Sequence, residues 1–375
     1  LGSPISKWGV ITAPYVSQEI VTGGKLALSQ AVAKQKINEA GLSLVRERFA
    51  LLTAVRQRYF ETLALQYRAQ VLQSLVKSAE QAYDVVDKLV KAKSAAELDR
   101  YQIRAELNEL RATLSAAEQQ KLAAWRALMA TVGQPFHQER DLDGSLSSTP
   151  AILTYEKSRD HVLRQHPEML IALVGVQRAR ASIDRARAQV IPNVTVGVGY
   201  QRQSKDDEHD WRFQVGVPLP IFNRNEGNIQ SAEAELGQAS QEVHRVANDL
   251  VRRLSLAFGD YSAALKQVEL YRESIRPDTQ IAYELAQKAY NGGAFGYLRV
   301  LQALRANQQA NLKLVTALAE MWKAASLISG LMLELNWTNS KGEIKIKKPK
   351  VKVGRGKSQE LTPTIGRPRS TRSTP

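Results

Sequence analysis

The sequence of 375 residues carries a formal net charge of +15, a hydrophobic content of 43% and no cysteine. A composition rich in Ala, Leu, Gln, Glu, Lys and Arg is typical of long helices, and the length allows several ordinary domains or one extended one. The absence of cysteine excludes disulfides, thiolate metal sites and a cysteine nucleophile. No apolar run reaches the length of a transmembrane helix, which leaves open a membrane β-barrel with its weaker signal.

The positive charge is concentrated at the C-terminus. Residues 336–375 contain 11 Lys and Arg against two acidic residues. Because this segment is also poor in aromatic residues, we expect a basic, disordered tail. At the other end, "LGSPISKWGV" lacks the charged and apolar regions of a secretory signal. We expect either a protein that is not exported or a chain that has lost its beginning.

Long helices are predicted on both sides of a central loop. Apolar residues recur at helical spacing from Leu26 to about Val90, where no proline occurs, and a second helix is expected from about Ala95 to Val132. "YEKSRDHVLRQ" predicts a short helix. Another is predicted after His166, because Pro167 suits a first helical turn.

Two strands of alternating apolar and polar residues follow, and we expect a β-hairpin over 193–220. Each strand has about nine residues, the length that crosses a bilayer at a tilt. The apolar face predicts lipid contact for nine residues: Val194, Val196, Val198, Tyr200, Trp211, Phe213, Val215, Val217 and Leu219. The bend "KDDEHD" (Lys205 to Asp210) is expected to be a solvated polar loop, and no metal or cofactor site is predicted anywhere.

A third long helix is expected from about Glu226 to Tyr290, with a stripe of apolar residues spaced by threes and fours. Pro277 lies inside this span and predicts a kink or a break. After the turn "YNGGAFGYL", a last helix should reach about Leu333. Helices of 60-odd residues extend roughly 100 Å, so they should pack together in an extended bundle.

The chain also repeats itself after about 200 residues. The matching pairs are Leu98 with Leu298, Trp125 with Trp322 and Gly133 with Gly330. We therefore expect a first structural repeat over 1–150, incomplete because it offers one candidate strand, from about Trp8 to Ile20. A second repeat is expected over 151–335, with the hairpin 193–220 and a long helical hairpin over 226–333.

This arrangement resembles the outer membrane efflux proteins, the TolC-like family. The likeness is carried by "SQEIVTGGK" (Ser17 to Lys25), "VGVPLPIFNRNEGNI" (Val215 to Ile229) and "YNGGAFGYLRVLQALRANQQANL" (Tyr290 to Leu312). The stretch "PLPIFNRNEGNI" looks most like the heavy-metal efflux branch. By this resemblance, we expect the chain to have lost a signal peptide, the first helices and the first strand.

The resemblance implies a mainly α fold with a small β part, in which long helical hairpins form a trimeric α-barrel tunnel and the strands form a shared outer-membrane β-barrel. It implies an exit duct of a tripartite efflux or secretion system, located in the outer membrane with a periplasmic extension. Its partners would be two further copies of the chain, a periplasmic adaptor, an inner-membrane pump and outer-membrane lipid. No enzyme activity and no cofactor are expected.

By the same resemblance, the two helix–turn–helix tips would form the periplasmic gate and the adaptor contact. The candidate residues are Glu97, Asp99, Arg100, Gly292, Gly293 and Arg299. The charged ones could make inter-helix ion pairs that hold the gate shut, or they could be solvated charges near helix ends. The two glycines could instead serve the turn, where positive φ is cheap for glycine.

Two other functions stay open. A periplasmic coiled-coil adaptor or helical scaffold would explain the long helices, but not the alternation over 193–220. Nucleic-acid binding through the basic tail would be non-specific, because Trp337 is the tail's one aromatic residue, and we expect no specific nucleic-acid partner.

Overall fold

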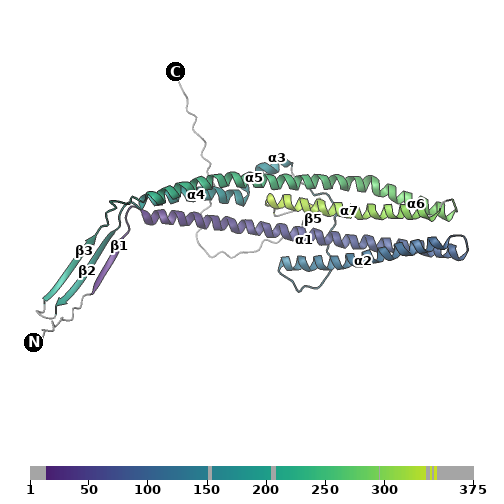
Figure 1. Cartoon of the computed structure of the whole chain (residues 1–375), viewed down its shortest axis with the longest axis horizontal. Coiled ribbons are helices and arrows are strands. Elements are labelled where there is room, and N and C mark those ends of the chain that lie inside the picture. Colours follow the sequence, from purple (N-terminus) through teal and green to yellow (C-terminus); the bar gives the residue numbers. More distant parts are fainter. Residues whose placement is uncertain are drawn as a thin grey trace, which may run out of the picture.

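The computed structural model describes residues 14–150, 154–203, 208–294, 296–334, 338–339 and 342–343. Long helices form a rod, and a β-sheet projects from one end of it (Figure 1). In chain order the elements are β1 (Tyr15–Ile20), α1 (Lys25–Lys91), α2 (Glu97–Val132), α3 (Tyr155–Gln165), α4 (Pro167–Ala188), β2 (Val194–Gln203), β3 (Glu208–Gly216), α5 (Glu226–Leu270), the π-helix η1 (Tyr271–Ile275), α6 (Arg276–Asn291), α7 (Tyr297–Leu331), β4 (Thr338–Asn339) and β5 (Gly342–Glu343).

The predicted helices are confirmed to within a few residues. α1 has 67 residues, which corresponds to about 100 Å of continuous helix. The break predicted at Pro277 is also confirmed, because η1 separates α5 from α6 directly before it. The N–H of Arg276 bonds the carbonyl of Tyr271, five residues back. Proline has no N–H to offer and its ring crowds the preceding turn, so the wider π-turn relieves the clash without ending the rod.

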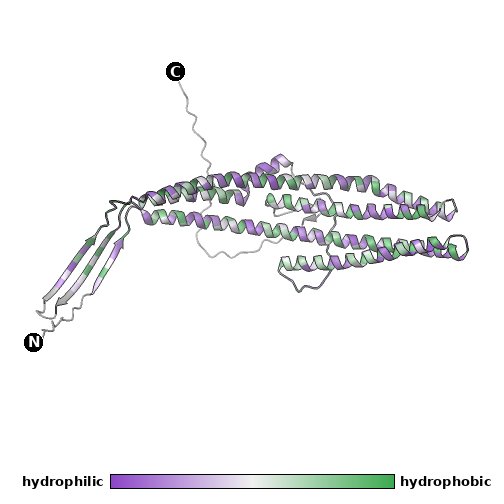
Figure 2. Cartoon of the chain, viewed as in Figure 1, coloured by the Kyte–Doolittle hydropathy of each residue, from purple (hydrophilic) through white to green (hydrophobic). Residues whose placement is uncertain are grey.

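α5 and α6 form an antiparallel hairpin with α7, as α1 does with α2 (Figure 1). α4 lies beside α5 close to the sheet and also contacts α1. Along the rod, apolar and polar residues alternate within each helix (Figure 2). Each such helix packs its apolar stripe against neighbouring helices and exposes its polar face to water, as expected for a helix in a bundle.

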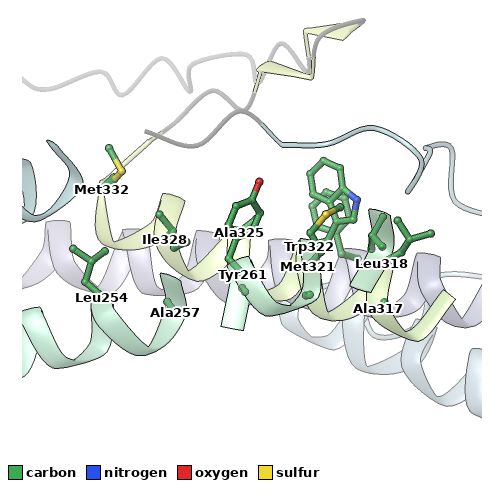
Figure 3. Packing of buried hydrophobic residues seen from close by; sticks show 14 of the residues in the cluster. Leu254, Ala257, Tyr261, Ala317, Leu318, Met321, Trp322, Ala325, Ile328 and Met332 are labelled. Atoms are coloured by element: carbon green, nitrogen blue, oxygen red, sulfur yellow. The ribbon is translucent and has the colours of Figure 1, made fainter. Parts of the chain in front are cut away.

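The main core lies midway along the rod, where α1, α5 and α7 meet. Side chains of α5, such as Leu254 and Tyr261, face those of α7, such as Met321 and Ile328 (Figure 3). Trp322 is fully buried, stacks on Phe60 with ring centroids 4.3 Å apart, and donates its indole N–H to the carbonyl of Leu146. The apolar character of α7 follows from this position.

Within the described residues, α7 is long and apolar enough to cross a membrane by length and composition. However, 61% of its most apolar window is buried inside the bundle. We therefore describe α7 as the core helix of the rod, in keeping with the sequence prediction that no helix spans a membrane.

The three strands form an antiparallel sheet in the order β1-β2-β3. Val196 pairs with Val215, Val198 with Phe213, and Tyr200 with Trp211. These cross-strand pairs place the predicted apolar residues of β2 and β3 on one face, which β1 extends with Val16 and Ile20. The side chains of that face are exposed: 74% for Val16, 76% for Phe213 and 69% for Val215.

Two details of the predicted hairpin are corrected. β3 ends at Gly216, so Val217 and Leu219 lie beyond the ladder, because Pro218 and Pro220 have no N–H for it. At the other end, Glu208 to Asp210 belong to β3 and pair with Gln203 to Gln201, so they are not part of the bend. The rest of the predicted bend, residues 204–207, lies outside the described residues.

The internal repeat is visible in the backbone. α1 and α5 begin after left-handed residues, Gly24 and Asn225, and the turns at the far ends of the two hairpins share one hydrogen-bond pattern. The match of Gly133 with Gly330 is wrong. The left-handed residue that ends α2 is Gly133 (φ 83°), and its counterpart after α7 is Leu333 (φ 59°). Three residues therefore separate the sequence alignment from the structural one.

The predicted basic tail falls mostly outside the described residues. Thr338–Asn339 pairs with Gly342–Glu343 in a two-residue antiparallel ladder. The predicted domain limits and the disorder of the tail stay predictions.

Candidate functional site at the hairpin tips

The two helical turns lie together at the end of the rod opposite the sheet (Figure 1). In the first, Ser94 donates its N–H to the carbonyl of Leu89, and in the second Ala294 donates to Ala289. The left-handed residue is Lys93 (φ 60°) in the first turn and Gly293 (φ 74°) in the second. The turn role proposed for the glycines therefore fits Gly293, whereas Gly292 has φ −85° and needs no glycine.

The predicted charges of the first tip do form ion pairs, and these lie within the first hairpin. Arg100 contacts Glu97 at 2.6 Å and lies 3.8 Å from Asp87 of α1, which also accepts from Lys91 at 2.6 Å. The hydrogen bond to Asp87 raises the pKa of Lys91. These contacts hold α1 and α2 together at the turn, where they are close to solvent and worth little individually.

Asp99 lies near Tyr290 of the second hairpin, whose hydroxyl has no hydrogen-bond partner among the described residues. Burial raises the pKa of the Tyr290 phenol, and the neighbouring carboxylate of Asp99 raises it further. The Tyr290 ring meets the buried Tyr297 ring edge to face, with centroids 5.5 Å apart. The remaining candidate, Arg299, is exposed on the first turn of α7. The carboxylate of Asp99 therefore acts on Tyr290 of the second hairpin through its charge.

A buried ion pair, which the sequence did not predict, also joins the two hairpins. Glu106 of α2 is 4% exposed, and its carboxylate accepts from Arg305 of α7 at 2.8 and 2.9 Å. Glu106 stands on the same helical face as the buried Ile103 and Leu110. An acidic residue inside an apolar stripe was the signal that could have revealed it, since a buried charge needs a partner.

A second group of missed residues fixes the junction between sheet and rod. The side-chain oxygen of Asn193 accepts from the Lys25 ammonium group at 2.6 Å and from the Thr22 N–H at 3.3 Å, and its amide donates to Glu19 at 2.7 Å. Lys25 is 7% exposed. Asn193 thus joins β1, the start of α1 and the start of β2, so the sheet leaves the rod at a defined angle.

No three His, Asp or Glu side chains gather as a metal site in the part of the chain that the structure describes. The prediction of no metal site stays a prediction, because part of the "KDDEHD" stretch lies outside those residues. The tips therefore carry non-covalent polar contacts, some within the first hairpin and some between the two hairpins.

Comparison with known proteins agrees with this architecture. Residues 159–329 match the model of the outer membrane efflux protein family. The matched residues run from α3 to near the end of α7, so the chain is similar to this family over its second half. Its relatives include the cobalt-zinc-cadmium resistance protein CzcC of Cupriavidus metallidurans, 25% identical over 313 residues, which cover 84% of this chain and 75% of that protein.

A second relative is the probable outer membrane lipoprotein SilC of Salmonella typhimurium, 27% identical, for which the match covers 70% of this chain and 60% of that protein. Among solved structures, a crystal structure of CusC aligns with a TM-score of 0.74 at 20% identity, covering 86% of this chain and 77% of that one. The outer membrane protein VceC of Vibrio cholerae aligns with a TM-score of 0.70 at 17% identity, covering 86% of both chains. These structures share the fold of this chain.

Proposed function

We propose that this chain is an outer membrane efflux protein, one protomer of an outer-membrane exit duct that carries substrate from the periplasm to the outside. The observation that carries the proposal is the apolar face of the sheet, which is exposed along its length in the single chain. A soluble protein rarely exposes so many large apolar side chains together, whereas a face of this kind suits lipid. The opposite face carries Ser17, Thr195 and Gln214, as a water-filled lumen requires.

The edges of the sheet support assembly with further copies. In the described residues β1 and β3 each pair on one side only, with β2. Lipid cannot satisfy free backbone N–H and C=O groups, so a membrane sheet must close into a barrel. Strands from neighbouring protomers would supply that closure, and the family resemblance favours a homotrimer.

The rod also has an unpartnered apolar stripe. Ile37, Leu44 and Leu51 recur every seven residues on α1 and are 72%, 72% and 55% exposed. The same spacing leads to Leu72, which is fully buried where α2 packs on α1. A seven-residue apolar repeat is the pattern by which helices pack on one another, and we assign the stripe to a neighbouring helix of the assembled tunnel.

Charge placed on the apolar face tests the membrane assignment. Val198→Arg sits near the middle of β2, where it should cost about 2–4 kcal/mol, and Val196→Arg, nearer the end, should cost less. Thr195→Arg is the matched control, because it adds the same charge to the same strand on the polar face. We expect assembled protein in outer-membrane fractions to fall in the order Thr195→Arg, Val196→Arg, Val198→Arg. Equal amounts of all three would favour the helical scaffold or adaptor instead.

The tips would form the inner gate and the contact with a periplasmic adaptor. Leu98 and Leu298 occupy equivalent places beside the two turns and are 64% and 58% exposed, which suits a protein partner. For the gate, Asp99→Ala removes a charge that lies near Tyr290 of the second hairpin, and we expect it to change the ionic conductance of the duct. Glu97→Ala is the control, because Glu97 pairs with Arg100 inside the first hairpin. The same conductance for both variants would remove Asp99 from the gate.

Metal cations are the cargo that we favour, because the relatives include a cobalt-zinc-cadmium resistance protein, CzcC, and a cation efflux system protein, CusC. A pyoverdine export protein is also a relative. A deletion strain provided with this duct and its pump should regain tolerance to a divalent cation. If the strain regained tolerance to organic compounds and not to the cation, the duct would export organic compounds instead of metal cations.

A further inference from the structure

Tyr15 lies across the polar face of the sheet. It is the first residue of β1 and pairs with Gly199 of β2, so its side chain shares a face with Gly199 and Gly197. Its hydroxyl reaches past β2 toward the side-chain oxygen of Gln214 on β3, at 3.4 Å. One ring thus crosses all three strands, and it is 47% exposed.

The two glycines make room for this ring. A Cβ atom built on Gly197 would lie 1.9 Å from the Tyr15 hydroxyl and 2.5 Å from the ring carbon that carries it, far inside van der Waals contact. A Cβ on Gly199 would lie 3.1 Å from the edge of the ring. No side chain larger than hydrogen fits at position 197 while Tyr15 keeps its place. We call Gly197 and Gly199 the glycine seat.

We propose that the glycine seat holds the Tyr15 ring down on the wall of the duct, and that the height of this ring sets the width of the lumen at that level. The inference rests on the proposed function, in which the polar face of the sheet lines the lumen. Tyr15 is the largest side chain described on that face of β1. If the ring leaves the seat, it must move into the water of the lumen, because the backbone of the sheet blocks the opposite direction.

Filling the seat is the direct test. Full-length protein is reconstituted in planar bilayers, and single-channel conductance is recorded for Gly197→Val and for the control Gly216→Val. Gly216 lies on the same face, where a Cβ would meet nothing closer than the Thr195 carbonyl at 4.0 Å. Both variants add a valine side chain to the lumen face, but only Gly197→Val also lifts the Tyr15 ring. We therefore expect Gly197→Val to conduct less than Gly216→Val. Equal conductance of the two variants would overturn the proposal.

A double variant separates the lifted ring from the added valine. Removing the ring in Tyr15→Ala/Gly197→Val should restore conductance above that of Gly197→Val, and failure to do so contradicts the proposal. If Gly197→Val does not assemble, Gly197→Ala replaces it, because a single methyl group already overlaps the Tyr15 hydroxyl. Wild-type protein that inserts but passes no current would instead contradict the proposed duct, so the two failures are distinguishable.

Discussion

At the scale of single residues, the repeat uses different side chains for the same backbone. Gly293 takes the left-handed conformation in the second tip, whereas Lys93 takes it in the first. A left-handed non-glycine residue costs about 1–2 kcal/mol, and glycine loses part of that advantage through its freedom in the unfolded chain. Lys93→Gly should therefore stabilise the protein by ~0.5–1 kcal/mol. Gly293→Ala is the mirror experiment and should lower the thermal midpoint; a fall with both variants would contradict the strain at Lys93.

His166 couples the start of α4 to pH. Its imidazole Nδ1 accepts the N–H of Glu168 at 3.3 Å, which requires the neutral ring. Burial lowers the pKa of His166, and Arg253 lowers it further, although Glu168 acts in the opposite direction. The unfolded chain therefore takes up the proton first, near pH 6.5. The stabilisation is complete above that pH and is lost as the pH falls toward the folded pKa.

The variant His166→Asn tests this dependence, because asparagine also caps helices but does not titrate. As the pH falls from about 7 to about 5, the wild type should lose stability relative to the His166→Asn variant, which thermal unfolding of the two proteins measures. Parallel pH profiles for the two proteins would show that the cap is insensitive to the charge of His166.

At the scale of elements, α2 packs mainly on α1 and makes few contacts with α7, although Ile103 of α2 joins an apolar cluster with Leu301 and Leu304 of α7. The ion pair of Glu106 with Arg305 spans that sparse boundary. Arg305→Ala would leave a buried carboxylate without this partner, at a cost of about 1.5–3 kcal/mol. Replacing both residues by leucine should recover most of the loss, since apolar pairs often substitute for buried ion pairs. A double-mutant cycle on chemical unfolding measures this, and additive losses would show that the two residues do not interact.

At the scale of the whole molecule, the sequence predicted the elements well because their signals are local. Helical spacing located α1 and α7, and strict alternation located β2 and β3. The predicted alignment of the two repeats was wrong near Gly133, because its counterpart Leu333 has the same backbone conformation but an unrelated side chain. Glu106 and Asn193 were missed because their partners, Arg305 and Lys25, lie far away in the sequence, where local patterns carry no information on contact.

The central claim is that the sheet crosses the outer membrane as part of a closed duct. The most direct measurement is the current through planar bilayers to which the purified full-length protein is added, with its oligomeric state determined in the same detergent. We expect a trimer that inserts and gives discrete, ion-conducting steps. A water-soluble monomer without β-structure, which never changes the bilayer current, would contradict it.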